Sequence, residues 1–224
     1  MPDNNFSFIA FGDIHDSVEN LERIPELATV DGLVVTGDLT NVGGVAEAKR
    51  VLDALAAHKP VLAAQIGNMD KQAVSGYLDE LGINIHARAR LLAPGLALMG
   101  AGGSTPTPFA TPSEFSEDAY AQWLEQAWAE ARAQAEQIVL VSHNPPRNTA
   151  CDIVGPGLHV GSQAVRDFIE KYQPPLCICG HIHEARAVDV LGNSRIVNPG
   201  NFSAGAYVVV NFMQNKLSAD LRIL

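Results

Sequence analysis

A chain of 224 residues, 47% of them hydrophobic, is long enough to bury one substantial core, and we expect a single domain over residues 1–224. The net charge of -10, with no dense Lys/Arg cluster, argues against a long nucleic acid as partner. No apolar run is long enough to cross a bilayer, and the polar start at residues 1–5 does not resemble a signal peptide, so we expect a cytoplasmic protein without a membrane partner. The oligomeric state stays open.

In the first third of the chain, short apolar runs alternate with helical patterns. The runs predict strands at residues 5–11, 32–36 and 61–66, and the periodic segments predict helices at residues 18–30, 45–58 and 71–81. Asp70 is expected to cap the last of these helices. Alternation of this kind builds parallel sheets with crossover helices.

The rest of the chain adds further strands and two more helices. Ser116 is expected to cap a long helix with Tyr120, Leu124, Ala127 and Ala131 on its apolar face, and a second helix is predicted at residues 162–172. Strands are predicted at residues 85–92, 95–100, 138–141 and 176–179. The tail is typical of antiparallel β-structure, with strands at residues 187–191, 194–197, 207–212 and 216–223. The pattern as a whole predicts a mixed α/β sandwich.

The three cysteines are too few, and odd in number, for a disulfide framework. Cys177 and Cys179 alternate along an apolar run and should face the same side of a buried strand. No second cysteine pair supports a zinc–thiolate site, so we interpret them as small buried hydrophobic residues.

Metal-ligand side chains follow five of the predicted strands at the point where each ends. They are Asp13 and His15, Asp38, Asn68, His143, and His181 and His183. Each piece alone is common in loops, but ligands bind outside the carboxyl ends of strands in open α/β sheets, so all seven are expected to converge. Imidazoles, carboxylates and an amide oxygen without a thiolate suit a borderline divalent metal.

In this order, these residues carry a family resemblance. The series Gly12-Asp13-x-His15, Gly37-Asp38, Gly67-Asn68, His143 and Gly180-His181-x-His183 resembles the calcineurin-like metallophosphoesterase superfamily over essentially the whole chain. The segments Ser142-His143-Asn144-Pro145-Pro146 and Asn198-Pro199-Gly200 are similar to segments of its small prokaryotic phosphoesterase branch.

The resemblance implies a four-layer αββα sandwich with two mixed β-sheets and a dinuclear metal centre. One ion would be held by Asp13, His15, Asp38 and His183, and the other by Asp38, Asn68, His143 and His181, with Asp38 bridging. Manganese, iron, zinc and nickel all suit such ligands. A hydroxide bridging the two ions would attack a small phosphate ester, without a covalent enzyme intermediate.

One departure from the family concerns the leaving group. Many members carry a histidine directly after the asparagine, where it helps to protonate the leaving oxygen, but Met69 stands there in this chain. A missing acid costs about 10²–10⁴-fold for poor leaving groups, so diesters and activated esters are favoured over alkyl monoesters. His159 is a candidate replacement and joins Asp38 and His143 as a predicted catalytic residue. Asn68, Asn144 and Arg147 are candidates for contacting the phosphate.

Two other functions stay open. A metal-dependent exonuclease is disfavoured by the acidic charge and by the absence of an added DNA-binding domain. A non-catalytic metal-binding scaffold is disfavoured because every metal-ligand position is filled. The sequence names neither the substrate nor the native metal.

Overall fold

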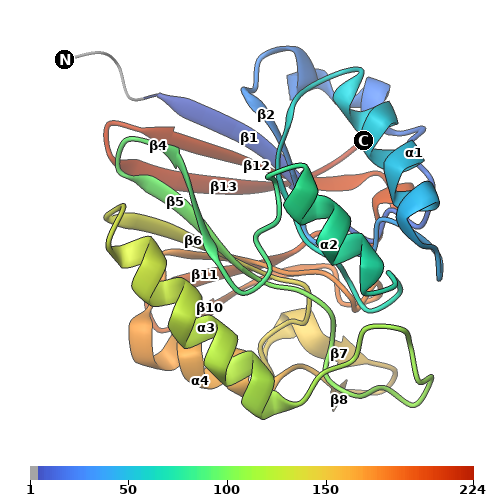
Figure 1. Cartoon of the computed structure of the whole chain (residues 1–224). Helices are drawn as coiled ribbons and strands as arrows, with labels where there is room; N and C mark the ends of the chain where they lie inside the picture. Colours follow the sequence, from blue (N-terminus) through green and yellow to red (C-terminus); the bar gives the residue numbers. More distant parts are fainter. Residues whose placement is uncertain (1–4) are drawn as a thin grey trace.

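The computed structural model describes residues 5–224, so most of the polar start considered above lies outside the described residues. Two large mixed β-sheets pack face to face, and helices cover their outer faces (Figure 1). The order of layers is therefore α, β, β, α, as the resemblance implied. Within residues 5–224, no helix combines the length and apolar character needed to cross a membrane.

The first sheet has the strand order β13-β12-β1-β2-β3. Its members are β1 (Phe6–Phe11), β2 (Gly32–Val35), β3 (Val61–Ala64), β12 (Ala206–Met213) and β13 (Lys216–Ile223). Strands β1, β2 and β3 are parallel, and β12 pairs antiparallel with both β1 and β13. The outer face is covered by α1 (Val45–Ala56) and α2 (Ala73–Glu80), together with the 3₁₀ helices η1 (Leu21–Arg23) and η2 (Pro25–Ala28).

The second sheet has the order β10-β11-β9-β6-β5-β4. Its members are β4 (Ala89–Ala93), β5 (Leu96–Ala101), β6 (Gln137–Ser142), β9 (Leu176–Ile178), β10 (Ala187–Leu191) and β11 (Ser194–Asn198). Helices α3 (Glu117–Arg132) and α4 (Gln163–Tyr172) cover its outer face. A small hairpin of β7 (Ile153–Val154) and β8 (Leu158–His159) follows η3 (Ala150–Asp152), and η4 (Phe202–Ala204) precedes β12.

Alternation along the strands assigns side chains to three buried layers. In β1, Ile9 and Phe11 pack toward the helices, whereas Phe8 and Ala10 pack between the two sheets. Cys177 and Cys179 both face the α3/α4 layer, as predicted. Burial raises the pKa of both thiols, so they stay neutral and act as small hydrophobic residues.

Two of the expected elements are wrong. Residues 18–30 do not form one helix, because Pro25 has no N–H to donate and starts a second 3₁₀ helix after η1. The strand expected at residues 85–92 begins only at Ala89, because Ala87 adopts a φ of 56°, which interrupts the extended chain.

The Ser116 cap is confirmed, since its hydroxyl accepts from the Ala119 N–H at 3.2 Å.

Strands β1, β2 and β3 run parallel in one sheet, as β6 and β9 do in the other. Their carboxyl ends meet at one end of the sandwich, where backbone hydrogen bonds link the loops. The Asp38 carbonyl accepts from the N–H groups of Ile14 and His15, and the His143 carbonyl accepts from Gly180 N–H. The loops at this end of the sandwich carry the predicted metal ligands.

Candidate metal centre

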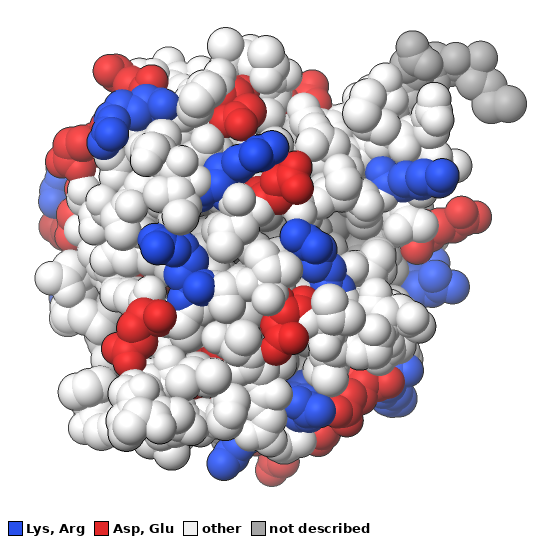
Figure 2. Space-filling model, turned by 180° about the vertical axis from the view of Figure 1, so that it is seen from behind, with Lys and Arg blue, Asp and Glu red and all other residues white. Residues whose placement is uncertain are grey.

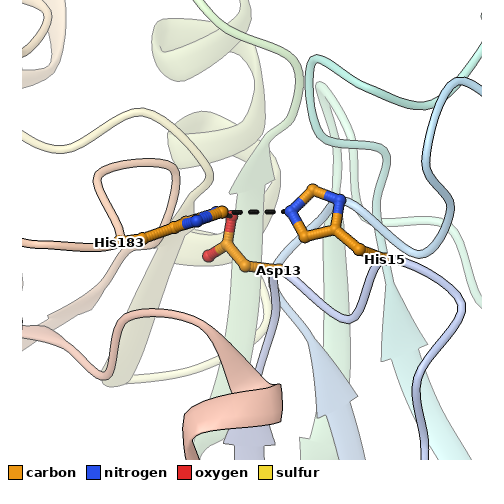
Figure 3. Close-up of side chains that lie close together, drawn as sticks. All are labelled: Asp13, His15 and His183. Carbon is orange, nitrogen blue, oxygen red and sulfur yellow. Dashed lines mark hydrogen bonds and ion pairs between the residues drawn. The ribbon is translucent and has the colours of Figure 1, made fainter.

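One group of ligand side chains comes from the loops after β1 and β9 (Figure 3). His183 Nε2 lies 3.1 Å from Asp13 Oδ1 and 3.3 Å from His15 Nε2. Coordinating atoms of all three residues lie within 4.8 Å of one another. Asp13 is buried, whereas the side chains of His15 and His183 are 21% and 42% exposed, so this group opens to solvent.

A second group comes from the loops after β3, β6 and β9. Fully buried His143 points its Nε2 at Asn68 Oδ1, 3.0 Å away. The ring of His181 lies beside that of His143, with 5.4 Å between their centroids. Coordinating atoms of Asp13, Asp38 and His143 also lie within 4.8 Å of one another, so the two groups are adjacent.

Asp38 lies between the two groups. Its Oδ2 is 3.4 Å from His143 Nε2 and 3.8 Å from His15 Nε2. Its other oxygen, Oδ1, accepts a hydrogen bond from the Met69 backbone N–H at 2.7 Å. One oxygen is therefore held by the backbone while the other faces both groups, which is the arrangement that a bridging carboxylate needs.

The spacing of these atoms fits divalent ions. Two neighbouring ligands that each lie about 2.0–2.1 Å from one ion, at tetrahedral or octahedral angles, are about 2.8–3.4 Å apart. The distances of 3.1 and 3.3 Å in the first group and 3.0 Å in the second fall in that interval. From Asp38 Oδ2, the distance of 3.4 Å to His143 also falls in it, whereas that of 3.8 Å to His15 lies above it. One hydrogen on His183 Nε2 cannot serve both neighbours fully, whereas a cation attracts all of these lone pairs at once.

Backbone with positive φ is concentrated in the ligand loops. Asp13, His15, Asp38 and His181 all adopt positive φ, between 47° and 68°, a region that is costly for residues other than glycine and that clusters at functional sites. A glycine directly precedes the first ligand in four of the five ligand loops, and it allows close approach. A Cβ added to Gly180 would lie 2.6 Å from Asp13 Oδ2, and one added to Gly67 would lie 2.5 Å from Asp38 Cγ.

Burial and neighbouring charges together raise the pKa of one buried histidine, His143, and lower that of the other, His181. Burial opposes protonation of His143, but the Asp38 carboxylate outweighs it and raises the pKa of His143 to about 9. Burial and the neighbouring His143 lower the pKa of His181 to about 4. Burial would raise the pKa of Asp13, but the hydrogen bond from His183 and the nearby imidazoles hold it below its usual value. Without an ion, a proton on His143 compensates the carboxylates.

Asp70 does not cap a helix, contrary to the expectation from the sequence. The N-cap of α2 is Gln72, and the buried Asp70 carboxylate instead accepts from the backbone N–H groups of Leu39, Thr40 and Gly67 at 2.8–3.1 Å. It ties the loop that carries Asp38 to the loop that carries Asn68. Burial and the nearby Asp38 raise the pKa of Asp70 to about 7.

Gln65 is a second supporting residue that sequence patterns did not reveal. Its buried amide nitrogen lies 3.1–3.3 Å from the carbonyls of Thr36, Ala101 and Val141. These carbonyls belong to both sheets, so Gln65 connects the sheets directly behind the site.

The remaining predicted site residues lie around the cluster. His159 Nδ1 is 2.6 Å from the buried Asp152 carboxylate, and within residues 5–224 His159 makes no hydrogen bond or ion pair with the seven ligand residues. Asn144 is buried and donates to Thr105 Oγ1 at 2.8 Å. Arg147 is exposed, and its guanidinium has no ion-pair partner in the described chain. Partly buried Met69 contributes its backbone N–H to Asp38.

Comparison with known proteins places this site in a family. The family model described as Calcineurin-like phosphoesterase matches residues 6–185, a span that contains all seven ligand residues. The chain belongs to the calcineurin-like phosphoesterase family. It is accordingly a metal-dependent phosphoesterase. The chain is also 36% identical over 194 residues to "Uncharacterized protein MJ1162" of Methanocaldococcus jannaschii, covering 85% of each protein.

Solved structures agree on the fold of this calcineurin-like phosphoesterase. TT1561 of Thermus thermophilus matches with a TM-score of 0.71 and 20% identity, over 96% of this chain and 98% of that one. A putative 5'-nucleotidase from Staphylococcus aureus, in complex with alpha-ketoglutarate, matches with a TM-score of 0.58 and 14% identity. That match covers 98% of this chain but 54% of the nucleotidase. At these identities the likeness shows the fold alone.

Proposed function

We propose that this phosphoesterase hydrolyses a small phosphate ester with two divalent ions, held by the seven residues at the strand ends. The observation that carries the proposal is Asp38, whose Oδ2 faces one histidine of each ligand group at 3.4 and 3.8 Å. We assign Asp13, His15 and His183 to one ion, and Asn68, His143 and His181 to the other. When bound, such a pair of ions activates a water molecule and neutralises charge on the phosphoryl group.

The preferred substrates are diesters and activated esters. The side chain that follows Asn68 is the thioether of Met69, which cannot donate a proton to a leaving oxygen. His159 is the candidate donor in its place, since Asp152 holds its Nδ1 and leaves Nε2 available. Exposed Arg147 is the candidate contact for a phosphate oxygen.

A long nucleic acid is not the proposed substrate. The chain carries a net charge of -10, and on the face shown in Figure 2 basic side chains alternate with acidic ones rather than forming a stripe. We do not propose a non-catalytic metal-binding scaffold, because all seven ligand-type residues that two-metal hydrolysis would use are present.

A hydrolysis screen of metal-loaded protein tests the proposal. Manganese-loaded enzyme should cleave bis(4-nitrophenyl) phosphate well, 4-nitrophenyl phosphate less well, and an alkyl monoester poorly. Activity should vanish with a chelator and return with metal. Equal cleavage of alkyl and nitrophenyl esters would contradict the substrate preference, and metal-independent hydrolysis would contradict the mechanism.

A further inference from the structure

The segment between β5 and α3, residues 102–116, lies against the loop that carries Asn68. We call it the β5–α3 loop. The backbone N–H of Ser113 donates to the Asn68 carbonyl at 3.0 Å, and the Ser113 hydroxyl donates to the Asp70 carbonyl at 2.6 Å. The loop is therefore anchored to the segment directly behind the second ligand group.

A chain of hydrogen bonds runs from Asn68 into this loop. Asn68 Nδ2 donates to Thr111 Oγ1 at 3.1 Å, and that hydroxyl donates to Glu114 Oε1 at 2.7 Å. The Glu114 carboxylate also accepts from the backbone N–H of Thr111 at 2.7 Å and from the hydroxyl of Thr107 at 2.6 Å.

The Glu114 carboxylate determines which groups donate and which accept in this series of hydrogen bonds. Burial would raise the pKa of Glu114, but the hydrogen bonds from Thr107 and Thr111 outweigh it and lower the pKa to about 2. An ionised carboxylate only accepts hydrogen bonds, so the proton of the Thr111 hydroxyl points to Glu114. The lone pairs of that hydroxyl are left to face Asn68, and they can be satisfied only by the amide nitrogen.

The two ends of the Asn68 amide are not interchangeable at a metal site. The oxygen is a ligand, whereas the NH₂ group presents only hydrogens. With Nδ2 committed to Thr111, Oδ1 must point to the opposite side, where it lies 3.0 Å from His143 Nε2.

We propose that Thr111 and Glu114 form a positioning relay that fixes the Asn68 amide with its oxygen toward the second metal ion. Neither residue is one of the seven assigned ligands, and both act through Asn68. The inference rests on the proposed function, because it concerns one of the two ions assigned there. Partners that orient metal ligands in this way contribute about 10–100-fold to metal affinity or activity.

Manganese-binding isotherms of the chelated full-length chain test the relay. Thr111→Val keeps the shape of the side chain but removes the hydroxyl, whereas Thr111→Ser keeps the hydroxyl. Thr107→Val is the matched control, because it also removes a hydrogen bond to Glu114 Oε1 but does not touch Asn68. Asn68→Ala identifies which binding step belongs to the second group.

The wild type should bind two ions. Thr111→Val should weaken the step identified by Asn68→Ala by about 10–100-fold and leave the other step unchanged. Thr111→Ser and Thr107→Val should bind both ions as the wild type does, and Thr111→Val and Thr107→Val should lower the unfolding temperature of the ion-free chain by similar amounts. Glu114→Gln supplies a second variant. Its amide can donate to Thr111, which frees the hydroxyl proton to favour the flipped Asn68 amide, so the same step should weaken.

Wild-type affinity for both ions in Thr111→Val, or an equal loss in Thr107→Val, would overturn the relay and leave the proposed function intact. A wild-type chain that binds fewer than two ions would contradict the proposed function itself. It would overturn the relay as well, because no second ion would then depend on the Asn68 amide.

Discussion

The substitution Gly67→Ala displaces the proposed bridging residue Asp38, backbone included, without removing any ligand. Gly67 directly precedes Asn68, and its N–H donates to Asp70 at 3.0 Å. A Cβ at this position would lie 2.5 Å from Asp38 Cγ and closer still to Asp38 Oδ1 and the Asp38 backbone nitrogen. Non-bonded carbons prefer to be about 3.5–4.0 Å apart, so Asp38 and the Gly67 backbone must move apart by about 1 Å.

A shift of that size has a large expected effect on catalysis. A misplacement of about 1 Å costs about 10²-fold in rate. Because tenfold corresponds to about 1.36 kcal/mol, we expect Gly67→Ala to raise the barrier by about 2.7 kcal/mol or more. Both ions should bind more weakly, since Asp38 is proposed to hold both.

The assay compares kcat/KM for bis(4-nitrophenyl) phosphate and manganese affinity in Gly67→Ala, in the wild type and in Gly76→Ala. Gly76 lies on the exposed face of α2, where an added Cβ would meet nothing within 4 Å. The control should keep full activity and gain about 0.5–1 kcal/mol of stability, because alanine is the better helix former. Near-normal activity in folded Gly67→Ala would refute the reasoning that the position of Asp38 governs the site.

Three further outcomes follow from the same geometry. Asp38→Ala should abolish metal-dependent hydrolysis even in excess manganese while the fold survives, because both cations lose their shared anion. Met69→His should accelerate poor leaving groups most, by at most about 10²–10⁴-fold, and barely change nitrophenyl esters. Loading the ion-free chain with manganese at neutral pH should release at least one proton, because His143, with a pKa of about 9, must deprotonate to bind, whereas His181, with a pKa of about 4, has already done so. The raised pKa of His183 and the ionisation of a metal-bound water add to the number of protons released.

Each of these outcomes has a direct check. Hydrolysis at the wild-type rate in Asp38→Ala would rule out the bridging role. For Met69→His, the measurement is the dependence of rate on leaving-group pKa. A shallow dependence already in the wild type would identify another acid, and His159→Ala should then steepen it. Proton release is followed with a pH indicator in weakly buffered solution, and the contribution of His143 should disappear well above pH 9. Release of no proton at neutral pH would contradict the raised pKa of His143.

The His143 shift also predicts how the stability of the ion-free chain depends on pH. The folded-state pKa of about 9 lies above the ordinary value of 6.5, so the folded state binds the proton more tightly than the unfolded state. The stabilisation from His143 is therefore fully present below about pH 6.5 and is lost as the pH rises through about 9.

The apolar runs in the sequence predicted the strands that precede the loops with the candidate metal ligands. Asp13, Asp38 and Asn68 each follow one of the predicted strands, and the parallel pairing of β1, β2 and β3 brings the ends of these strands together. Strand β1 ends where predicted, whereas β2 and β3 end one and two residues earlier, at Val35 and Ala64. The fold class followed from the same alternation and from the resemblance. The long-range pairing did not follow, because local patterns predict hairpins without showing which sheet they join. Strand β12 pairs with β1 from the opposite end of the chain, whereas β11 joins β9 in the other sheet.

Asp70 and Thr111, which support the ligand loops, could not be predicted from sequence patterns for a related reason. Asp70 has the sequence position of a helix cap, but its oxygens accept from Leu39 and Thr40, about thirty residues away. Thr111 lies in a polar loop without periodicity, and it contacts Asn68 at a separation of 43 residues. Such contacts depend on how loops that are far apart in the sequence pack against one another.

The most direct test of the dinuclear site is anomalous diffraction from crystals loaded with manganese. We predict two peaks per chain, about 3.5–4 Å apart, one beside Asp13, His15 and His183 and the other beside Asn68, His143 and His181. Asp38 should contact both. A single peak, or two peaks that do not share Asp38, would contradict the proposed site.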